Sequence, residues 1–170
     1  HQMGRKPIPP DGLAVLISTR RKAPNDAFPQ QAKVIGNYAG PRLAYLEARA
    51  AGFDDVILLG PSGQLAEAPT ANLFIARGGI VATPRLNDGI LPGITRRHII
   101  QLCNALGCTV EERAIFAEDA LVADEAWLSG TGIELAPIAR FNDRTLPAVR
   151  QLFPKLLAAY GRRVRGQEGE

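Results

Sequence analysis

Two tight turns near the middle of the chain restrict its fold most strongly. The first, Gly-Pro-Ser-Gly at 60–63, follows a short apolar run, and the second, Arg-Gly-Gly at 77–79, divides another. Connections this short join neighbouring antiparallel strands, because parallel strands need a much longer crossover. We therefore expect two successive hairpins, which argue against a parallel, doubly wound sheet. The expected strands are 56–59 returning at 64–67, and 72–76 returning at 80–83.

Helices are expected on both sides of these hairpins. Residues 41–50 form a helix with Pro41 near its first turn, where the missing N–H is harmless, and with Leu43, Leu46 and Ala50 on one face. A second helix over 94–106 carries a stripe of four apolar side chains and ends at Gly107, a typical C-terminal cap. The stripe consists of Ile99, Leu102, Cys103 and Leu106.

Further strands and helices complete a mixed pattern. The expected strands are 13–18, 109–114, 125–128 and 135–140, and the remaining helices are 118–122 and 146–160. Mixed elements with several hairpins, and no glycine-rich phosphate loop after the first strand, indicate an α+β or irregular α/β domain. We expect mostly antiparallel strands with flanking helices.

Length and charge limit the class of protein. The 170 residues are enough for one domain with a core, which we place at 13–160 between an extended linker at 1–12 and a polar tail at 161–170. Part of the net charge of +3 comes from arginines near the C-terminus, which stand close to acidic residues. We therefore expect a solvated tail there and not a surface that binds nucleic acid. We find no apolar run long enough for a bilayer and no secretory signal, so a cytoplasmic location is expected, without a nucleic-acid or membrane partner.

The cysteines and the internal histidine offer little chemistry. Cys103 and Cys108 have neither zinc-site spacing nor a disulfide framework, so we expect two reduced thiols with Cys103 in the core, and no metal site. His98 is expected to be a surface or boundary side chain.

Five motifs occur together in one order. Lys33 precedes Gly-Asn-Tyr at 36–38, Glu67 precedes Asn-Leu-Phe at 72–74, and the segments Ile-Leu-Pro-Gly-Ile-Thr-Arg at 90–96 and Ser-Gly-Thr at 129–131 follow. Over about residues 13–140, this set resembles the class IV aminotransferases, the fold type IV enzymes that use pyridoxal 5′-phosphate (PLP). Several motifs at once are much more specific than one. The chain would then be the larger, C-terminal, cofactor-binding domain of such an enzyme, most similar to the branched-chain type.

The resemblance assigns roles to four residues around the cofactor ring. Lys33 matches the lysine that holds the cofactor covalently, and its released amine would move the substrate α-proton. Glu67 matches the glutamate that pairs with the pyridine nitrogen, although alone it reads as a surface acid at a strand end. Tyr38 matches a tyrosine that bonds the ring oxygen. The apolar Leu91 matches a residue on the ring face, and both Tyr38 and Leu91 could instead be core packing.

A phosphate site is expected where the second helix begins. Gly93, Ile94 and Thr95 open it, and free backbone donors at a helix N-terminus bind anions, although simple capping would need the same residues. By resemblance, Thr131 is a further phosphate contact. The turn through Gly132 would present backbone donors to a substrate carboxylate, or would be only a turn.

Members of the family carry an additional N-terminal domain ahead of the strand at 13–18. The resemblance in this sequence does not include that domain. We therefore expect a missing domain or companion chain, together with a homodimer. The segment Ala-Pro-Thr-Ala at 68–71 also departs from the glycine-rich run common in the family, so we expect an altered pocket wall.

The reaction implied is amino-group transfer between an amino acid, most similar to the branched-chain L type, and a 2-oxo acid. An aminodeoxychorismate lyase or a D-amino acid transaminase is the alternative within the family. A non-catalytic fragment or assembly domain is the alternative outside it.

Overall fold

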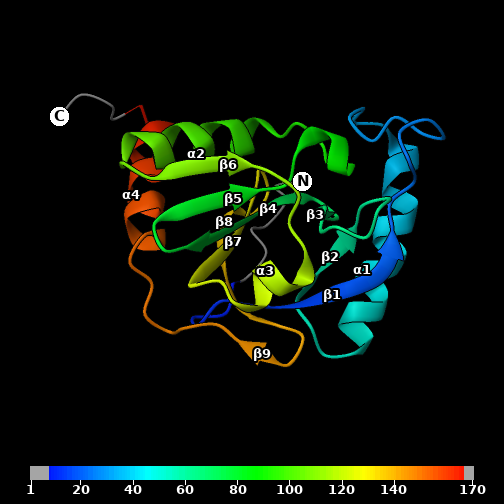
Figure 1. The fold of residues 1–170 in the computed structure, drawn as a ribbon, viewed down its shortest axis with the longest axis horizontal. Coiled ribbons are helices and arrows are strands. Elements are labelled where there is room, and N and C mark those ends of the chain that lie inside the picture. The colour runs from blue at the N-terminus through cyan, green and yellow to red at the C-terminus, as the bar shows by residue number, and fades with distance from the viewer. Residues whose placement is uncertain (1–7, 167–170) are drawn as a thin grey trace.

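The structure is a computed structural model that describes residues 8–166, so parts of the expected linker and tail lie outside the described residues. One sheet runs through the domain in the order β2-β1-β8-β7-β4-β5-β6, with β3 paired to β4 and β9 paired to β8. Helix α1 lies at one end of the molecule and α4 at the other (Figure 1). The strands are β1 (Leu13–Arg21), β2 (Asp55–Leu59), β3 (Glu67–Ala68), β4 (Ala71–Arg77), β5 (Ile80–Thr83), β6 (Thr109–Glu112), β7 (Glu125–Gly130), β8 (Glu134–Phe141) and β9 (Arg144–Thr145). The helices are the 3-10 turns η1 (Ile35–Tyr38) and η2 (Leu86–Asp88), and α1 (Ala39–Ala50), α2 (Ile94–Ala105), α3 (Ala117–Leu121) and α4 (Phe153–Val164).

The sheet is mixed and mostly antiparallel, as expected. Strand β1 runs parallel to both β2 and β8, and β5 runs parallel to β6, whereas the β3–β4, β4–β5, β4–β7, β7–β8 and β8–β9 pairs are antiparallel. The hairpin of β4 and β5 is confirmed, with Arg77 opposite Ile80 across Gly78 and Gly79, both of which have positive φ. Glycine allows this conformation without the steric cost of a Cβ atom.

The first expected hairpin is only partly correct. Its turn is present, but the return arm makes a single antiparallel bridge, between Leu59 and Leu65. The chain then leaves β2, and Glu67 pairs with Asn72 of β4. The strand β3 therefore belongs to a second, tighter hairpin with β4 that the turn residues did not predict.

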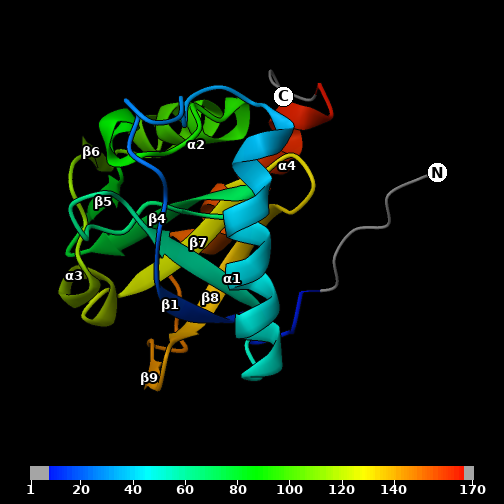
Figure 2. The same cartoon turned by 90° about the vertical axis from the view of Figure 1, so that its right-hand side faces the viewer.

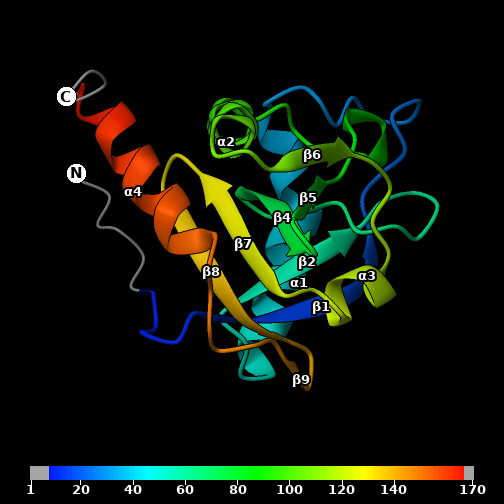
Figure 3. The same ribbon diagram turned by 60° about the vertical axis from the view of Figure 1, so that its left-hand side comes forward.

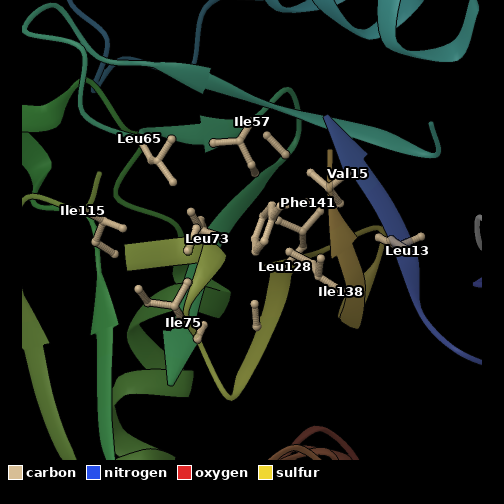
Figure 4. Packing of buried hydrophobic residues seen from close by; sticks show 14 of the residues in the cluster. Leu13, Val15, Ile57, Leu65, Leu73, Ile75, Ile115, Leu128, Ile138 and Phe141 are labelled. Atoms are coloured by element: carbon tan, nitrogen blue, oxygen red, sulfur yellow. The ribbon is translucent and has the colours of Figure 1, made fainter. Parts of the chain in front are cut away.

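Two apolar clusters fill the opposite sides of the sheet. Side chains from β1, β2, β4, β7 and β8 converge on a sheet core that the curved strands surround, and Figure 4 labels Leu13, Ile57, Leu73, Leu128 and Phe141 among them. On the other face, α2 and α4 cover Phe74 and Trp127, whose rings stack with centroids 5.6 Å apart. Figure 3 shows these two helices beside β7 and β8. Alternate residues of β4 and β7 thus face different cores, as strand geometry requires.

Helix α1 covers the end of the sheet near β1 and β2 (Figure 2). Its buried side chains are Ala44 and Ala48, so the small side chains face the sheet. Leu43 and Leu46 share the expected face, but that face is about half exposed, at 53% and 48%.

The last helix begins later than expected. The carboxylate of Glu125 accepts hydrogen bonds from the backbone N–H groups of Gln151, Leu152 and Phe153 at 2.7–2.8 Å. These bonds cap α4 at its first turn, and Leu146, expected inside the helix, packs into the sheet core instead. Residues 161–164, expected in the tail, form the last turn of α4.

Helix α2 begins at Ile94 as expected and ends at Ala105, one residue early, with Leu106 as its C-cap. Ile99, Leu102 and Cys103 of the expected stripe are buried, whereas Leu106 is 39% exposed. Both cysteines are free thiols, and Cys103 is buried. Within residues 8–166, we find no helix of the length and apolarity that a membrane span requires.

Candidate active site

Glu67 is the buried acid around which the site is built. Its side chain enters from the β3–β4 hairpin, which sets it directly opposite Asn72. The Asn72 side-chain amide donates to Glu67 Oε2 at 2.9 Å, and the backbone N–H of Leu91 donates to the same oxygen at 3.0 Å. The Asn72 amide also donates to the Leu91 carbonyl oxygen at 3.0 Å. One carboxylate oxygen is thus held by two donors from different segments.

The other oxygen of Glu67 is taken by a lysine that the sequence did not single out. The Lys22 ammonium forms an ion pair and hydrogen bond with Oε1, and both residues are buried, each 8% exposed. Lys22 directly follows β1, which extends three residues beyond the expected 13–18. The longer strand carries Lys22 into the interior and places it at the acid.

The electrostatic environment of Glu67 combines opposing effects. Burial raises the pKa of its carboxyl above the ordinary value of 4.5, while Lys22, the Leu91 amide and Arg96 act to lower that pKa. Burial has the larger effect, so the net shift of the pKa is upward, and Lys22 is the largest of the influences that oppose it.

Arg96 fixes the first turn of α2 beside this acid. Its buried guanidinium donates to the Pro84 carbonyl oxygen at 2.8 Å and pairs with Glu112 at 2.7 Å. It also donates to the Thr83 hydroxyl, which itself donates to the Leu73 carbonyl oxygen. The helix start is therefore anchored to β4, β5 and β6.

The N-terminus of α2 lies next to Asn72. Gly93 is the N-cap residue, without a side-chain cap, and a Cβ atom at this position would collide with Asn72 Oδ1. Thr95 is buried, whereas Ile94 is 67% exposed. The first-turn N–H groups of a helix have no partner within the helix, so this end is suited to an anion.

The end of β7 completes this side of the site. Ser129 pairs with Asn72 across the β4–β7 ladder, and its buried hydroxyl has no hydrogen-bond partner among residues 8–166. Gly130 packs against the backbone of Thr70 and Ala71, where a Cβ atom would come within 2.7 Å of the Thr70 carbonyl oxygen. Thr131 and Gly132 follow in the turn before β8, and both are exposed.

The segment that contains Lys33 lies beside the site with its lysine in solvent. Lys33 is exposed, but the backbone around it is fixed, because the Asn37 side-chain amide donates to the Pro29 and Ala32 carbonyl oxygens at 2.9 and 2.8 Å. Tyr38 is half-buried and lines a pocket of about 310 Å³. The other lining residues are Arg42, Tyr45, Asp55, Pro69 and Thr70.

The structure thus brings Glu67, Leu91 and Gly93 together through Asn72. It places Tyr38 in one pocket with Pro69 and Thr70, and it places Gly130 against Thr70. Sequence reasoning missed Lys22, and it included Asn72 and Ser129 in motifs without assigning either a role. Asn72 could have been found from the short Ala68–Ala71 turn, which sets residues 67 and 72 opposite each other. No local signal marks Lys22.

These features fit a ligand with a cationic ring nitrogen and a phosphate. The buried carboxylate suits the nitrogen, while the uncapped helix start and the unpartnered Ser129 hydroxyl suit the anion. Fold and site together therefore agree with the class of domain that the sequence motifs indicate.

Comparison with known proteins agrees. The model of the amino-transferase class IV family matches residues 2–141. The chain belongs to the class IV aminotransferase family.

Named relatives and solved structures point to the same group. A probable branched-chain-amino-acid aminotransferase of Synechocystis sp. is 35% identical over 146 residues, covering 86% of this chain and 48% of that protein. The branched-chain aminotransferase of Thermoproteus uzoniensis, solved with norvaline, has a TM-score of 0.91 at 35% identity, covering 95% of this chain and 54% of that one. The enzyme of Thermobaculum terrenum, solved in its PLP form, has a TM-score of 0.89 at 32% identity, covering 92% and 52%. The chain spans about half the length of the curated relatives it matches.

Proposed function

We propose that this chain is the cofactor-binding domain of a PLP-dependent aminotransferase that moves an amino group between an amino acid and a 2-oxo acid. The observation that carries the proposal is the buried Glu67 carboxylate, fixed by Asn72 and Leu91 next to the uncapped start of α2. A buried acid and an uncapped helix start, both next to Asn72, offer partners for the ring nitrogen and the phosphate of a phosphorylated pyridine.

Each residue has a defined task in this proposal. The Lys33 amine holds the cofactor aldehyde and then carries a proton to and from the substrate α-carbon. Glu67 keeps a proton on the pyridine nitrogen. When bound, the cofactor supplies the electron sink that makes the substrate α-proton acidic. Leu91 would pack against the ring, and Tyr38 would donate a hydrogen bond to the ring oxygen.

The anion end is assigned to the start of α2. The Ile94 and Thr95 N–H groups hold the phosphate, with Gly93 giving access, and Thr131 adds a hydroxyl. Gly132 presents backbone donors to the substrate carboxylate. Thr131 and Gly132 are exposed, so both are open to a ligand.

Branched-chain amino acids are the proposed substrates. The relatives and solved structures described above are named as branched-chain aminotransferases, at 32–35% identity. The alternative activities within the family would be separated from this one by turnover with D-alanine or aminodeoxychorismate.

Further protein contacts are proposed for the α1 side of the domain. Ile35 is 92% exposed, and Val34, Leu43 and Leu46 are between 41% and 53% exposed. Such apolar exposure beside a site suits cover by a companion domain and by a second copy in a homodimer. The cytoplasmic location expected from the sequence stays a prediction.

The test is covalent mapping of the cofactor. We expect the purified chain mixed with PLP and reduced with borohydride to carry one pyridoxyl group on Lys33. The Lys33→Ala variant should lose this adduct, whereas Lys155→Ala on the exposed side of α4 should keep it. An adduct that maps to Lys155, or that persists in Lys33→Ala, would contradict the proposal.

A further inference from the structure

Lys22 is the one buried lysine of residues 8–166, and the proposed chemistry gives it no task. Its backbone is fixed, because its N–H donates to the Leu59 carbonyl oxygen at 2.8 Å. Its side chain reaches from the end of β1 to the acid on β3. A buried ammonium needs a partner of opposite charge, and Glu67 is that partner.

The two oxygens of Glu67 differ in how firmly they are held. Oε2 accepts from the Asn72 side-chain amide and from the Leu91 backbone N–H. Asn72 is held in the β3–β4 hairpin, and its amide also donates to the Leu91 carbonyl oxygen, which fixes Leu91. Oε1 accepts from Lys22, which is joined to its backbone by a flexible chain of methylene groups. Oε1 is therefore the oxygen that an incoming N–H donor can take, provided that Lys22 leaves.

There is space for the ammonium to leave. Lys22 also lines a pocket of about 190 Å³ on the side of the 36–37 segment. Gln30 and Asn37 border this pocket and offer polar atoms, and the pocket is open to solvent. The side chain could therefore turn away from Glu67 without movement of β1.

We propose that Lys22 is a displaceable internal cation, which occupies Glu67 Oε1 in the cofactor-free domain and gives up that position when a cationic heteroaromatic N–H binds. The inference rests on the proposed function, since the heteroaromatic ring is that of PLP. Lys22 keeps the acid ionised and oriented while the site is free, and it competes with the ring nitrogen for the same oxygen. Removing the ammonium therefore strengthens binding of the ring.

The first test measures affinity with pyridoxamine 5′-phosphate, which has the ring nitrogen and the phosphate but no aldehyde. Its binding is followed by its own fluorescence, independently of Lys33 and of turnover. Removing a competing buried ion pair should make Lys22→Met bind it about tenfold more tightly than the original chain. Lys155→Met is the matched control for loss of a lysine and should bind unchanged. Equal or weaker binding by Lys22→Met would overturn the inference.

The second test uses the unmodified chain, so it does not depend on a variant that folds. Acetylation by acetic anhydride, read by peptide mass spectrometry, should be slow at Lys22 in the free chain. Saturating pyridoxine 5′-phosphate, which keeps the ring nitrogen and the phosphate but has no amine for the anhydride to acetylate, should raise the rate at Lys22 toward that of exposed Lys155. Continued protection of Lys22 in the saturated chain would refute its displacement.

The two proposals fail in different ways. Binding of pyridoxamine 5′-phosphate that is unaffected by Lys22→Met, with Lys22 still protected, overturns the role of Lys22 alone. No binding by either chain, together with no pyridoxyl adduct on Lys33, overturns the proposed function and this inference with it.

Discussion

Replacing Lys22 with methionine should destabilise the domain by an amount that depends on pH. The substitution keeps the apolar length of the side chain and removes the charge opposite Glu67. Since both residues are 8% exposed, the acid then keeps its two neutral donors but loses the cation paired with it. Breaking a buried pair by removing one partner costs about 3–5 kcal/mol, and we expect a loss in this range at neutral pH.

The sign of the pH dependence follows from the Glu67 carboxyl. Burial already raises its pKa above 4.5, and without Lys22 the pKa rises further. At a pH between the Glu67 pKa of the folded original chain and that of folded Lys22→Met, the variant still holds a proton on Glu67 and the original chain has released it. The stability of Lys22→Met relative to the original therefore falls as pH rises from the raised Glu67 pKa of the original chain to the higher one of the variant, by up to about 1.4 kcal/mol per pH unit.

Urea unfolding followed by circular dichroism at several pH values between about 5 and 8 measures this difference. Lys155→Met should show no such slope, and the double variant Lys22→Met with Glu67→Gln should lose most of it. A destabilisation of equal size at every pH would refute the reasoning, because it would mean that the lost interaction is packing and not charge.

Three further predictions concern the frame of the site. Gly93→Ala should cost about 1–3 kcal/mol, since its Cβ atom must displace the Asn72 side chain from its hydrogen bonds; unchanged urea stability would show that Asn72 can yield. Cys108 should react with a thiol reagent at pH 8 in the folded chain, and Cys103 only on unfolding, because burial raises the pKa of Cys103 to about 12; equal rates would contradict this. Glu125→Gln should lower stability by about 2 kcal/mol in thermal unfolding through loss of the charged cap on α4, and an unchanged midpoint would argue against that cap.

Local chemistry explains what could be predicted from the sequence. The β4–β5 hairpin and α2 were placed correctly, since glycine conformation at 78–79 and at 107 and the apolar period of α2 are properties of short segments. The motif residues Glu67, Leu91 and Gly93 were also identified in advance, and the structure brings them together.

The remaining features depend on contacts distant in sequence. The polar end of β1 is extended because Arg21 lies beside Leu59 of β2, and this extension positions Lys22. Helix α4 begins where the distant Glu125 caps it, not where its apolar pattern starts. Helix α1 likewise packs through the small side chains of Ala44 and Ala48, because the sheet approaches it closely on that face. The apolar pattern of the helix alone does not predict this contact.

The position of β1 has a consequence for how the domain assembles. β1 is central in its part of the sheet, parallel to β2 on one side and to β8 on the other, with Leu13 beside Ile138. During synthesis, β1 must wait for more than a hundred further residues before its second neighbour exists, and contacts of such long range slow folding. We therefore expect a chain halted before β8 to leave one edge of β1 unpaired, open to association with other strands and to proteolysis.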